Sequence, residues 1–589
     1  MKSFLKYTLA TIVGIMISSI LMIIIGIGFI GIIISVGDKP VEVKSNSILH
    51  FKIAQPIPDR GSNNPFEGFD FTNFTLTPQI GLDQVLKNIE KAKTDDRIKG
   101  IYIETGMYSP GIATVEEIRN VLIDFKESGK FIIAFSNDIM LQSNYYLCSV
   151  ADRIYMNPVG IMQFWGLRSE VVFFKGAMEK LGIDMQIIRH GEYKSAIEPF
   201  TSDHMSEESR KQTLAYMNSI WNGMVNKISN ARNIPVEKLN KYADNLTINR
   251  VSVAFETNLI DSIKYQDEVL AELVQLSGLE KDHKLRLVSM SKYAKVPKGK
   301  TKGFTRDKIA IVYASGVIGF GEGTESSIGS VKYANSLRKA RKDTNIKAIV
   351  IRVNSPGGGA LASDIIWREV DLARQVKPVV ASFGNVAASG GYYIVSTADT
   401  IVAQPNTITG SIGVFGTIPN IQKFLNDKLG ITIDVAKTNK HSDFPAFYRP
   451  LNAAEKQFLR TGIEETYKTF VTYVAEGRKM SFEEVDKIAR GRVWSGIAAK
   501  ENGLVDIIGG LNKAVEIAAE MAGLDNYRIT SLPVQEDPYQ KLLNQLSGNI
   551  KMRMLRADLG EAYRYYHNLN RLLGMDGIQT RLPYEIEIY

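Results

Sequence analysis

Short apolar runs alternate with helical patterns along most of the chain. Residues 347–354 (KAIVIRVN) are rich in β-branched side chains, which predicts a buried strand. A glycine-rich turn follows, and then residues 361–375 (LASDIIWREVDLARQ), in which apolar side chains recur every three or four positions. Residues 378–383 (PVVASF) again have the pattern of a strand. This order predicts βαβ units, in which helices cover a parallel sheet, and therefore an α/β fold.

The same pattern occurs twice in the chain. RIKGIYIE (Arg97–Glu104) matches NIKAIVIR (Asn345–Arg352), with Ile98 and Ile346 248 positions apart. Three further matches follow in the same order: NYYLCSVADRIYMNP at 144–158 with GYYIVSTADTIVAQP at 391–405, KLGID at 180–184 with KLGIT at 428–432, and TNLID at 257–261 with NGLVD at 502–506. Collinear matches at a nearly constant spacing indicate a tandem duplication.

The N-terminal region has a different composition. Residues 7–37 carry no charged side chain and consist mainly of Ile, Leu, Val and Gly. Their number exceeds the roughly 20 residues that a helix needs to cross a bilayer. Lys2 and Lys6 precede the run, which by the positive-inside rule favours a cytoplasmic N-terminus and an exported body. We therefore expect a transmembrane anchor over residues 7–36, in contact with membrane lipid.

The remaining chain divides into four segments. We expect a first repeat over 44–278, a linker over 279–306, a second repeat over 307–524 and a C-terminal extension over 525–589. The linker contains seven lysines, which suits an exposed connector. The extension has helical and aromatic character and no evident counterpart in the first repeat.

Composition excludes several classes of protein. Apolar residues make up 44% and charged residues 23% of the 589 positions, as in a folded globular protein. The net charge of +8 is spread along the chain without a basic stripe, so no nucleic-acid partner is expected. The single cysteine, Cys148, cannot form an intrachain disulfide, and its apolar neighbours predict a buried thiol. The six histidines show no metal-ligand spacing, so we expect neither a metal nor another cofactor.

Three glycine-rich motifs of the second repeat could carry chemistry. NSPGGG (Asn354–Gly359) lies between a predicted strand and a predicted helix, where backbone N–H groups can face a negative charge. It could bind phosphate or stabilise an oxyanion, but no Gly-Lys-Ser/Thr follows as in a nucleotide P-loop. GNVAASGGYY (Gly384–Tyr393) and TITGSIGVFG (Thr407–Gly416) come next. The latter contains Ser411, which taken alone could also be an ordinary turn residue.

NSPGG, ASGGYY and TGSIG, in this order and spacing, resemble the signal peptide peptidase A family, also called protease IV or peptidase family S49. GRVWSGIAAKENGLVD (Gly491–Asp506) is similar to this family as well. The resemblance implies a duplicated fold related to Clp protease and crotonase, a membrane span and a homo-oligomer. It implies a serine endopeptidase of the outer face of the cytoplasmic membrane that degrades cleaved signal peptides and other apolar peptides. Its nucleophile would be Ser411 and its general base Lys194, within GEYKSAIEPF.

The duplication is consistent with a site divided between the repeats. The region of the first repeat that matches TGSIG is GIMQFWG (Gly160–Gly166), which has no serine, and the alignment sets Lys194 opposite Ser442. A lysine base must be neutral at working pH, and its free pKa is about 10.4. We therefore expect Lys194 to be buried, within hydrogen-bonding reach of Ser411, with Glu192 and Glu198 pointing away.

Further assignments follow for the site. Backbone N–H groups of Gly357, Gly358 and Ile412 are candidates to hold the oxyanion. A Ser-His-Asp triad, for example with His190, remains an alternative, as do a crotonase-like enzyme acting on acyl-CoA and an inactive scaffold of the same fold. The sequence leaves open whether Lys194 serves its own chain or a neighbouring one.

Overall fold

The structure, a computed structural model, describes the chain in ten ranges: 6–8, 10–21, 41–63, 69–70, 75–76, 79–280, 283–297, 305–324, 326–535 and 578–582. Residues 10–21 are helical, and residues 22–36 of the expected anchor lie outside the described residues. In the described part of the chain, no helix is long and apolar enough to cross a membrane.

The first repeat is built on a six-stranded sheet with the order β10-β7-β5-β4-β1-β11. Each neighbouring pair of strands is parallel. The strands are β1 (Ser47–Ile53), β4 (Ile98–Thr105), β5 (Phe131–Ser136), β7 (Arg153–Met156), β10 (Ser262–Ile263) and β11 (Leu287–Ser289). Its helices include α2 (Leu82–Thr94), α3 (Ile112–Lys126), α4 (Gln142–Cys148), α7 (Glu207–Arg232), α8 (Val236–Asp244), α9 (Val251–Glu256) and α10 (Gln266–Leu276). The βαβ pattern of the sequence thus corresponds to a parallel sheet with helices.

The second repeat has an eight-stranded sheet in which β22-β18-β17-β15-β12-β23 follows the same order of strands as in the first. The strands are β12 (Lys308–Ser315), β15 (Ile346–Ser355), β17 (Val379–Ala388), β18 (Thr400–Ala403), β19 (Ile408–Gly410), β21 (Val493–Ser495), β22 (Ile507–Ile508) and β23 (Arg528–Leu532). Its helices include α12 (Ser330–Lys342), α13 (Ala360–Arg374), α14 (Gly390–Tyr393), α15 (Ala453–Arg478), α16 (Phe482–Ile488), α17 (Gly496–Glu501) and α18 (Leu511–Met521). The duplication predicted from the sequence is therefore visible in the strand order.

Two of the expected segment boundaries need correction. The segment 279–306 is not an exposed connector throughout, because β11 within it pairs with β1 and the helix α11 (Met290–Ala294) buries Met290 and Tyr293. The segment after 525 does have a counterpart in the first repeat, because β23 pairs with β12 as β11 pairs with β1. Strands of three to five residues at a sheet edge leave too short a pattern to be recognised.

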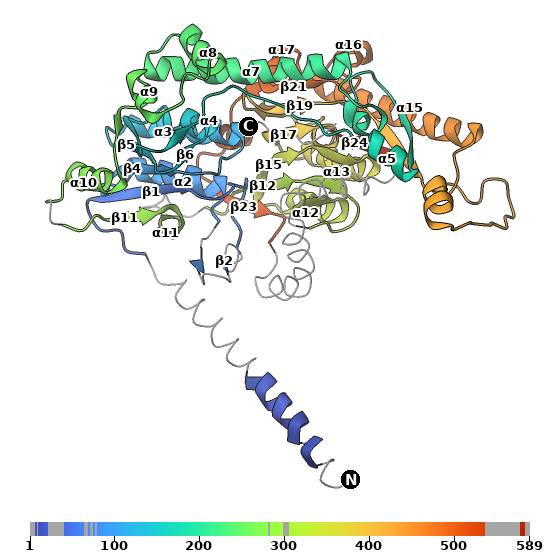
Figure 1. The fold of residues 1–589 in the computed structure, drawn as a ribbon, viewed down its shortest axis with the longest axis horizontal. Helices are drawn as coiled ribbons and strands as arrows, with labels where there is room; N and C mark the ends of the chain where they lie inside the picture. Colours follow the sequence, from blue (N-terminus) through green and yellow to red (C-terminus); the bar gives the residue numbers. More distant parts are fainter. Residues whose placement is uncertain are drawn as a thin grey trace.

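A third sheet joins the two repeats, which lie side by side in Figure 1. Its order is β14-β13-β16-β24-β20-β9, with β9 (Asp184–Arg189), β13 (Val317–Gly319), β14 (Ser327–Gly329), β16 (Gly357–Gly359), β20 (Phe415–Asn420) and β24 (Ile578–Arg581). Strand β9 of the first repeat runs antiparallel to β20 of the second. The repeats also share a core, since Ala388, Ile408 and Val493 pack within the main apolar cluster of the first repeat.

Candidate active site

Pairing between β9 and β20 brings the two predicted catalytic segments together. Arg189, at the end of β9, is the partner of Phe415 at the start of β20, and the next residue, His190, donates its N–H to Val414 O at 3.0 Å. The chain then turns at Gly191, with φ 93°, and reaches Lys194. Extension of the antiparallel pairing beyond the strands thus places Lys194 beside Ser411.

The side chain of Lys194 ends among three oxygen atoms. Its Nζ lies 3.0 Å from Ser411 Oγ, 2.9 Å from Ser411 O and 2.8 Å from Ser389 Oγ. A neutral amine has two N–H groups and one lone pair. It can donate to the Ser411 carbonyl and to Ser389 Oγ while it accepts the proton of the Ser411 hydroxyl. The three oxygen atoms fit the three N–H donors of an ammonium as well as this arrangement of the neutral amine, so burial decides between the two forms.

Burial favours this neutral form. Lys194 is fully buried, and burial lowers its pKa well below the ordinary value of 10.5. No carboxylate of the described residues opposes this effect. Glu192 lies 3.8 Å from Arg490, and Glu198 accepts a hydrogen bond from Ser206 Oγ at 2.6 Å. Both carboxylates thus have partners other than the amine.

The sequence prediction did not include Ser389 among the site residues. It lies at the end of β17 in the GNVAASGGYY motif, with φ 55° and ψ −117°, a conformation that a residue other than glycine rarely adopts. Its N–H donates to Gly410 O at 2.8 Å, one residue before Ser411. Ser411 also has a positive φ, 49°, and donates its N–H to Arg492 O at 2.6 Å. Two serines held in strained backbone conformations that face one lysine are typical of a functional site.

Close packing fixes the backbone of Lys194. A Cβ on Gly491, which has φ 86°, would lie 2.6 Å from the Lys194 backbone nitrogen. On the other side, Gln212 of α7 donates to Tyr193 O and accepts from Val493 N, at 3.1 and 3.0 Å. Figure 1 shows α7 extending from the first repeat toward β21 of the second. The lysine therefore has little freedom to move away from Ser411.

The oxyanion candidates lie close to the serines but differ in their surroundings. Gly357 has φ 96°, and its N–H donates to Ser355 Oγ at 3.1 Å. Gly358 lies in the middle of β16, which pairs with β24. Ile412 follows Ser411 directly, and its carbonyl accepts from Gly491 N at 2.7 Å. The role of these three N–H groups stays a prediction.

Strand β24 lies beside Gly390, which follows Ser389. It runs antiparallel to both β16 and β20, and its residues 579–581 are buried. A Cβ on Gly390, next to Ser389, would lie 2.9 Å from both Thr580 O and Thr580 Oγ1. Beyond the strand, Leu582 donates its N–H to Pro356 O at 2.6 Å. Ser411 has an exposed fraction of 0% in this arrangement.

Comparison with protein families matches "Peptidase family S49" over residues 124–280 and 371–525, one match in each repeat. The chain belongs to peptidase family S49. The family consists of serine-type peptidases, so the chain is a serine-type peptidase. The crotonase-like alternative is thereby disfavoured.

Several S49 relatives are similar over most of their length. "Serine protease SPPA, chloroplastic" of Arabidopsis thaliana is 36% identical over 80% of this chain and 70% of its own. "Protease 4" of Haemophilus influenzae is 36% identical over 75% and 73%, and "Protease 4" of Salmonella typhi is 34% identical over 81% and 78%. Among solved structures, a mutant ClpP1 of Listeria monocytogenes is 18% identical and covers 35% of this chain and 94% of its own, with a TM-score of 0.24.

The remaining candidate groups of this S49 chain lie apart from Ser411. The His190 ring stacks on Tyr467, and its Nδ1 lies 2.7 Å from Glu464 Oε2, so this histidine has partners other than the serines. Cys148 is buried, as expected. Among the described residues, no group of three or more His, Cys, Asp or Glu side chains could hold a metal ion.

Proposed function

We propose that this S49 peptidase is a membrane-anchored serine endopeptidase with a Ser–Lys dyad, in which Ser411 is the nucleophile and Lys194 the general base. The observation that carries this proposal is the distance of 3.0 Å between Lys194 Nζ and Ser411 Oγ at a site where burial favours the neutral amine. A general base needs both this reach and this protonation state.

The reaction would proceed by acyl transfer. Lys194 takes the proton of Ser411 Oγ as the oxygen attacks the scissile carbonyl, and returns it to the leaving amine. Backbone N–H groups of Gly358 and Ile412, with Gly357 after release of its bond to Ser355, would stabilise the oxyanion. Water then hydrolyses the acyl-enzyme, with Lys194 again as the base. Ser389 Oγ, 2.8 Å from Nζ, would hold the amine in the required direction throughout.

The substrate would bind as an extended chain. Strand β24 shows that a main chain fits antiparallel between β16 and β20, next to Ser389. Leu582 at its end packs within the apolar cluster that includes Ala388, Ile408 and Val493, so this position suits an apolar side chain. Both features favour apolar peptides, among them cleaved signal peptides.

The membrane location belongs to the same proposal. The uncharged run over 7–37 supports a single span, with the N-terminus in the cytoplasm and the catalytic body in the periplasm. Such an anchor would hold the site near peptides that remain in the bilayer. A homo-oligomer is proposed on the family resemblance, whereas the 3.0 Å contact of Lys194 with Ser411 of the same chain supports a dyad formed within one chain.

Hydrolysis of an apolar peptide ester tests the proposal. The variants Ser411→Ala and Lys194→Ala should lose activity by roughly 1000-fold or more, because each removes one member of the dyad. Ser396→Ala and Lys377→Met are matched controls, because Ser396 is a buried serine of the same repeat and Lys377 donates to Ala340 O, away from the dyad. Full activity in either dyad variant would refute the assignment.

A further inference from the structure

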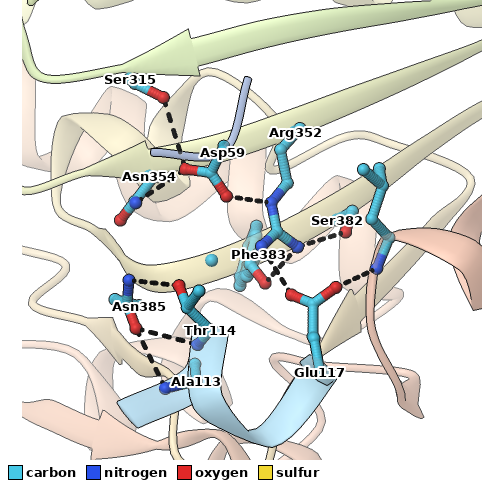
Figure 2. A network of polar contacts seen from close by, with 12 residues as sticks. Asp59, Ala113, Thr114, Glu117, Ser315, Arg352, Asn354, Ser382, Phe383 and Asn385 are labelled. Carbon is cyan, nitrogen blue, oxygen red and sulfur yellow. Dashed lines mark hydrogen bonds and ion pairs between the residues drawn. The ribbon is translucent and has the colours of Figure 1, made fainter. Parts of the chain in front are cut away.

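A buried polar network connects the two repeats and includes side chains of β15 and β17 (Figure 2). Its centre is Arg352 on β15, which is fully buried. Arg352 Nε donates to Asp59 Oδ1 at 2.7 Å, and Nη2 donates to Glu117 Oε1 at 2.5 Å. Its Nη1 donates to Ser382 Oγ and Phe383 O of β17 at 3.0 and 3.1 Å. Both carboxylates come from the first repeat, and the guanidinium comes from the second.

The charged groups of the network are buried, and one guanidinium faces two carboxylates. Burial alone would lower the pKa of Arg352, but the carboxylates of Glu117 and Asp59 outweigh it and raise this pKa. Burial raises the pKa of Glu117, against the opposing effects of Arg352 and the Leu511 N–H at the start of α18, which donates to Glu117 at 2.8 Å. Buried charges are tolerated only where such partners are present.

Asn354 connects this network to the strands of the site. Its Nδ2 donates to Asp59 Oδ2 at 2.7 Å, and its Oδ1 accepts from Val386 N at 3.2 Å. This contact lies where the pairing of β15 with β17 shifts register, between Val353 and Ser355. The side chain thus supplies an acceptor where the strands are out of register. Asn354 stands three residues before Gly357, and Val386 stands three residues before Ser389.

The adjacent residue of β17, Asn385, makes a second connection between the repeats. Its Oδ1 accepts from the N–H groups of Ala113 and Thr114 at 3.0 and 3.2 Å, at the start of α3. Figure 2 shows Asn385 above this helix, on which Glu117 also lies. In the first repeat, the position 248 residues before Arg352 is Glu104, which instead binds His50 and Lys52. The position of the first repeat that matches Arg352 therefore carries no guanidinium, and the network occurs only once among the described residues.

We infer that Asp59, Glu117, Arg352 and Asn354 are positioning residues of the peptidase, through which the first repeat fixes the glycine turn and Ser389 of the second. The inference rests on the proposed Ser–Lys chemistry. The contact of Asp59 with Asn354 holds the end of β15, which leads to the glycine turn. Asn354 also holds Val386 of β17, which leads to Ser389. The positions of the glycine turn and of Ser389 therefore both depend on the Asp59–Asn354 hydrogen bond. The first repeat then contributes more to catalysis than Lys194 alone.

An exchange of the two side chains tests this inference. In the double variant Asp59→Asn/Asn354→Asp, the amide introduced at position 59 can accept from Arg352 Nε and donate to the carboxylate introduced at position 354, which in turn accepts from Val386 N. The hydrogen bond of position 59 to Arg352, drawn in Figure 2, the hydrogen bond of position 354 to Val386 N and the net charge are thus conserved. The single variant Asn354→Asp instead places two carboxylates face to face, and Asn354→Ala removes the contact without a change of charge.

We measure kcat and KM for the hydrolysis of a peptide ester. The concentration of active molecules is determined by titration with a fluorophosphonate probe that reacts with Ser411, and kcat is given per titrated molecule. We expect Asn354→Asp and Asn354→Ala to lower kcat about 10- to 100-fold with KM changed less than about twofold, because displaced catalytic groups mainly affect kcat. The exchange variant should recover kcat to within about threefold of the wild type.

Glu369→Gln is the control, because Glu369 is a buried carboxylate of α13 that binds Arg338 and Arg341 outside this network. It should lower the melting temperature and leave kcat per titrated site unchanged. Wild-type kcat in Asn354→Ala, or a folded exchange variant as slow as the single ones, would overturn the inference. An inactive wild type would instead overturn the proposed function.

Discussion

Lys194 Nζ lies 3.0 Å from Ser411 Oγ although 217 positions separate the two residues in the sequence. Each repeat supplies one of them, and the pairing of β9 with β20 holds them in register. A chain that contains only one repeat therefore lacks half of the site. Each half carries one member of the proposed dyad, so we expect neither half to be active alone.

The pH dependence of stability should reveal the neutral Lys194. The unfolded chain binds a proton at this lysine up to its ordinary pKa of 10.5, whereas the folded chain, with a pKa well below that value, does not. Stability therefore rises with pH between the folded and the unfolded pKa, by up to about 1.4 kcal/mol per pH unit. The variant Lys194→Met lacks this contribution.

Chemical unfolding of both proteins between neutral pH and pH 10 measures the effect. The difference in unfolding free energy, wild type minus Lys194→Met, should increase with pH. The activity of the wild type should rise through the same lowered pKa, because only the neutral amine accepts the proton of Ser411. A pH-independent difference would mean that Lys194 is charged in the folded protein.

The hydroxyl of Ser389 should be required for efficient catalysis. Ser389→Ala removes one of the three oxygen atoms around Lys194 Nζ, so the amine is less well directed at Ser411, and kcat should fall about 10- to 100-fold. Ser389→Gly loses the same hydroxyl but relieves the positive φ of 55° and should be the more stable of the two.

Kinetics and melting temperatures of these two variants separate the effects. If the two variants lose kcat equally but differ in melting temperature, the missing hydroxyl and not the backbone conformation explains the loss of kcat. Mass spectrometry after fluorophosphonate treatment should find the label on Ser411 in both variants and in the wild type. A label on Ser389 in the wild type would instead indicate that Ser389 is the nucleophile.

The sequence was sufficient to predict the repeats and to select Lys194 and Ser411, which the structure brings within 3.0 Å, but not to predict what surrounds them. Repeated strand patterns such as those around Ile98 and Ile346 predicted the duplicated α/β fold. Ser389 was not recognised, because a serine followed by two glycines is also typical of a helix start with close packing. Strand β24 was not recognised either, because its four residues carry no periodic pattern and their partners lie more than 150 positions away.

The close approach of Gly491 to Lys194 can be tested by adding one methyl group. Gly491→Ala places a Cβ 2.6 Å from the Lys194 backbone nitrogen, so the lysine has to move and activity should fall at least about 100-fold. The substitution also costs about 1–2 kcal/mol of backbone strain at φ 86°.

Gly503→Ala controls for the strain. Gly503 has a similar φ of 82°, but a Cβ there would meet only the Met480 sulfur at 3.6 Å. This variant should lose comparable stability and keep its kcat per titrated site. If both variants lose activity equally, backbone strain and not the position of Lys194 explains the effect.

Strand β24 should limit access to Ser411. Ser411 has an exposed fraction of 0%, and β24 pairs with β16 and β20 beside Gly390, so we expect a substrate to reach the site more readily once this strand has left. A chain that ends at residue 577 lacks the strand, and one that ends at residue 583 keeps it. Fluorophosphonate should label Ser411 at least about 10-fold faster in the shorter chain, because the accessible fraction of molecules sets the apparent rate.

A synthetic peptide with the sequence of residues 578–582 provides the complementary measurement. It should inhibit the shorter chain competitively with the peptide ester and inhibit the longer chain less, because there the covalently attached strand already occupies the place between β16 and β20. Equal labelling rates of the two chains, together with a peptide that does not inhibit, would show that the release of β24 from the site requires no measurable free energy. Loss of labelling in the shorter chain would show instead that β24 is part of the active structure, since its pairing with β16 would then be needed to hold the glycine turn.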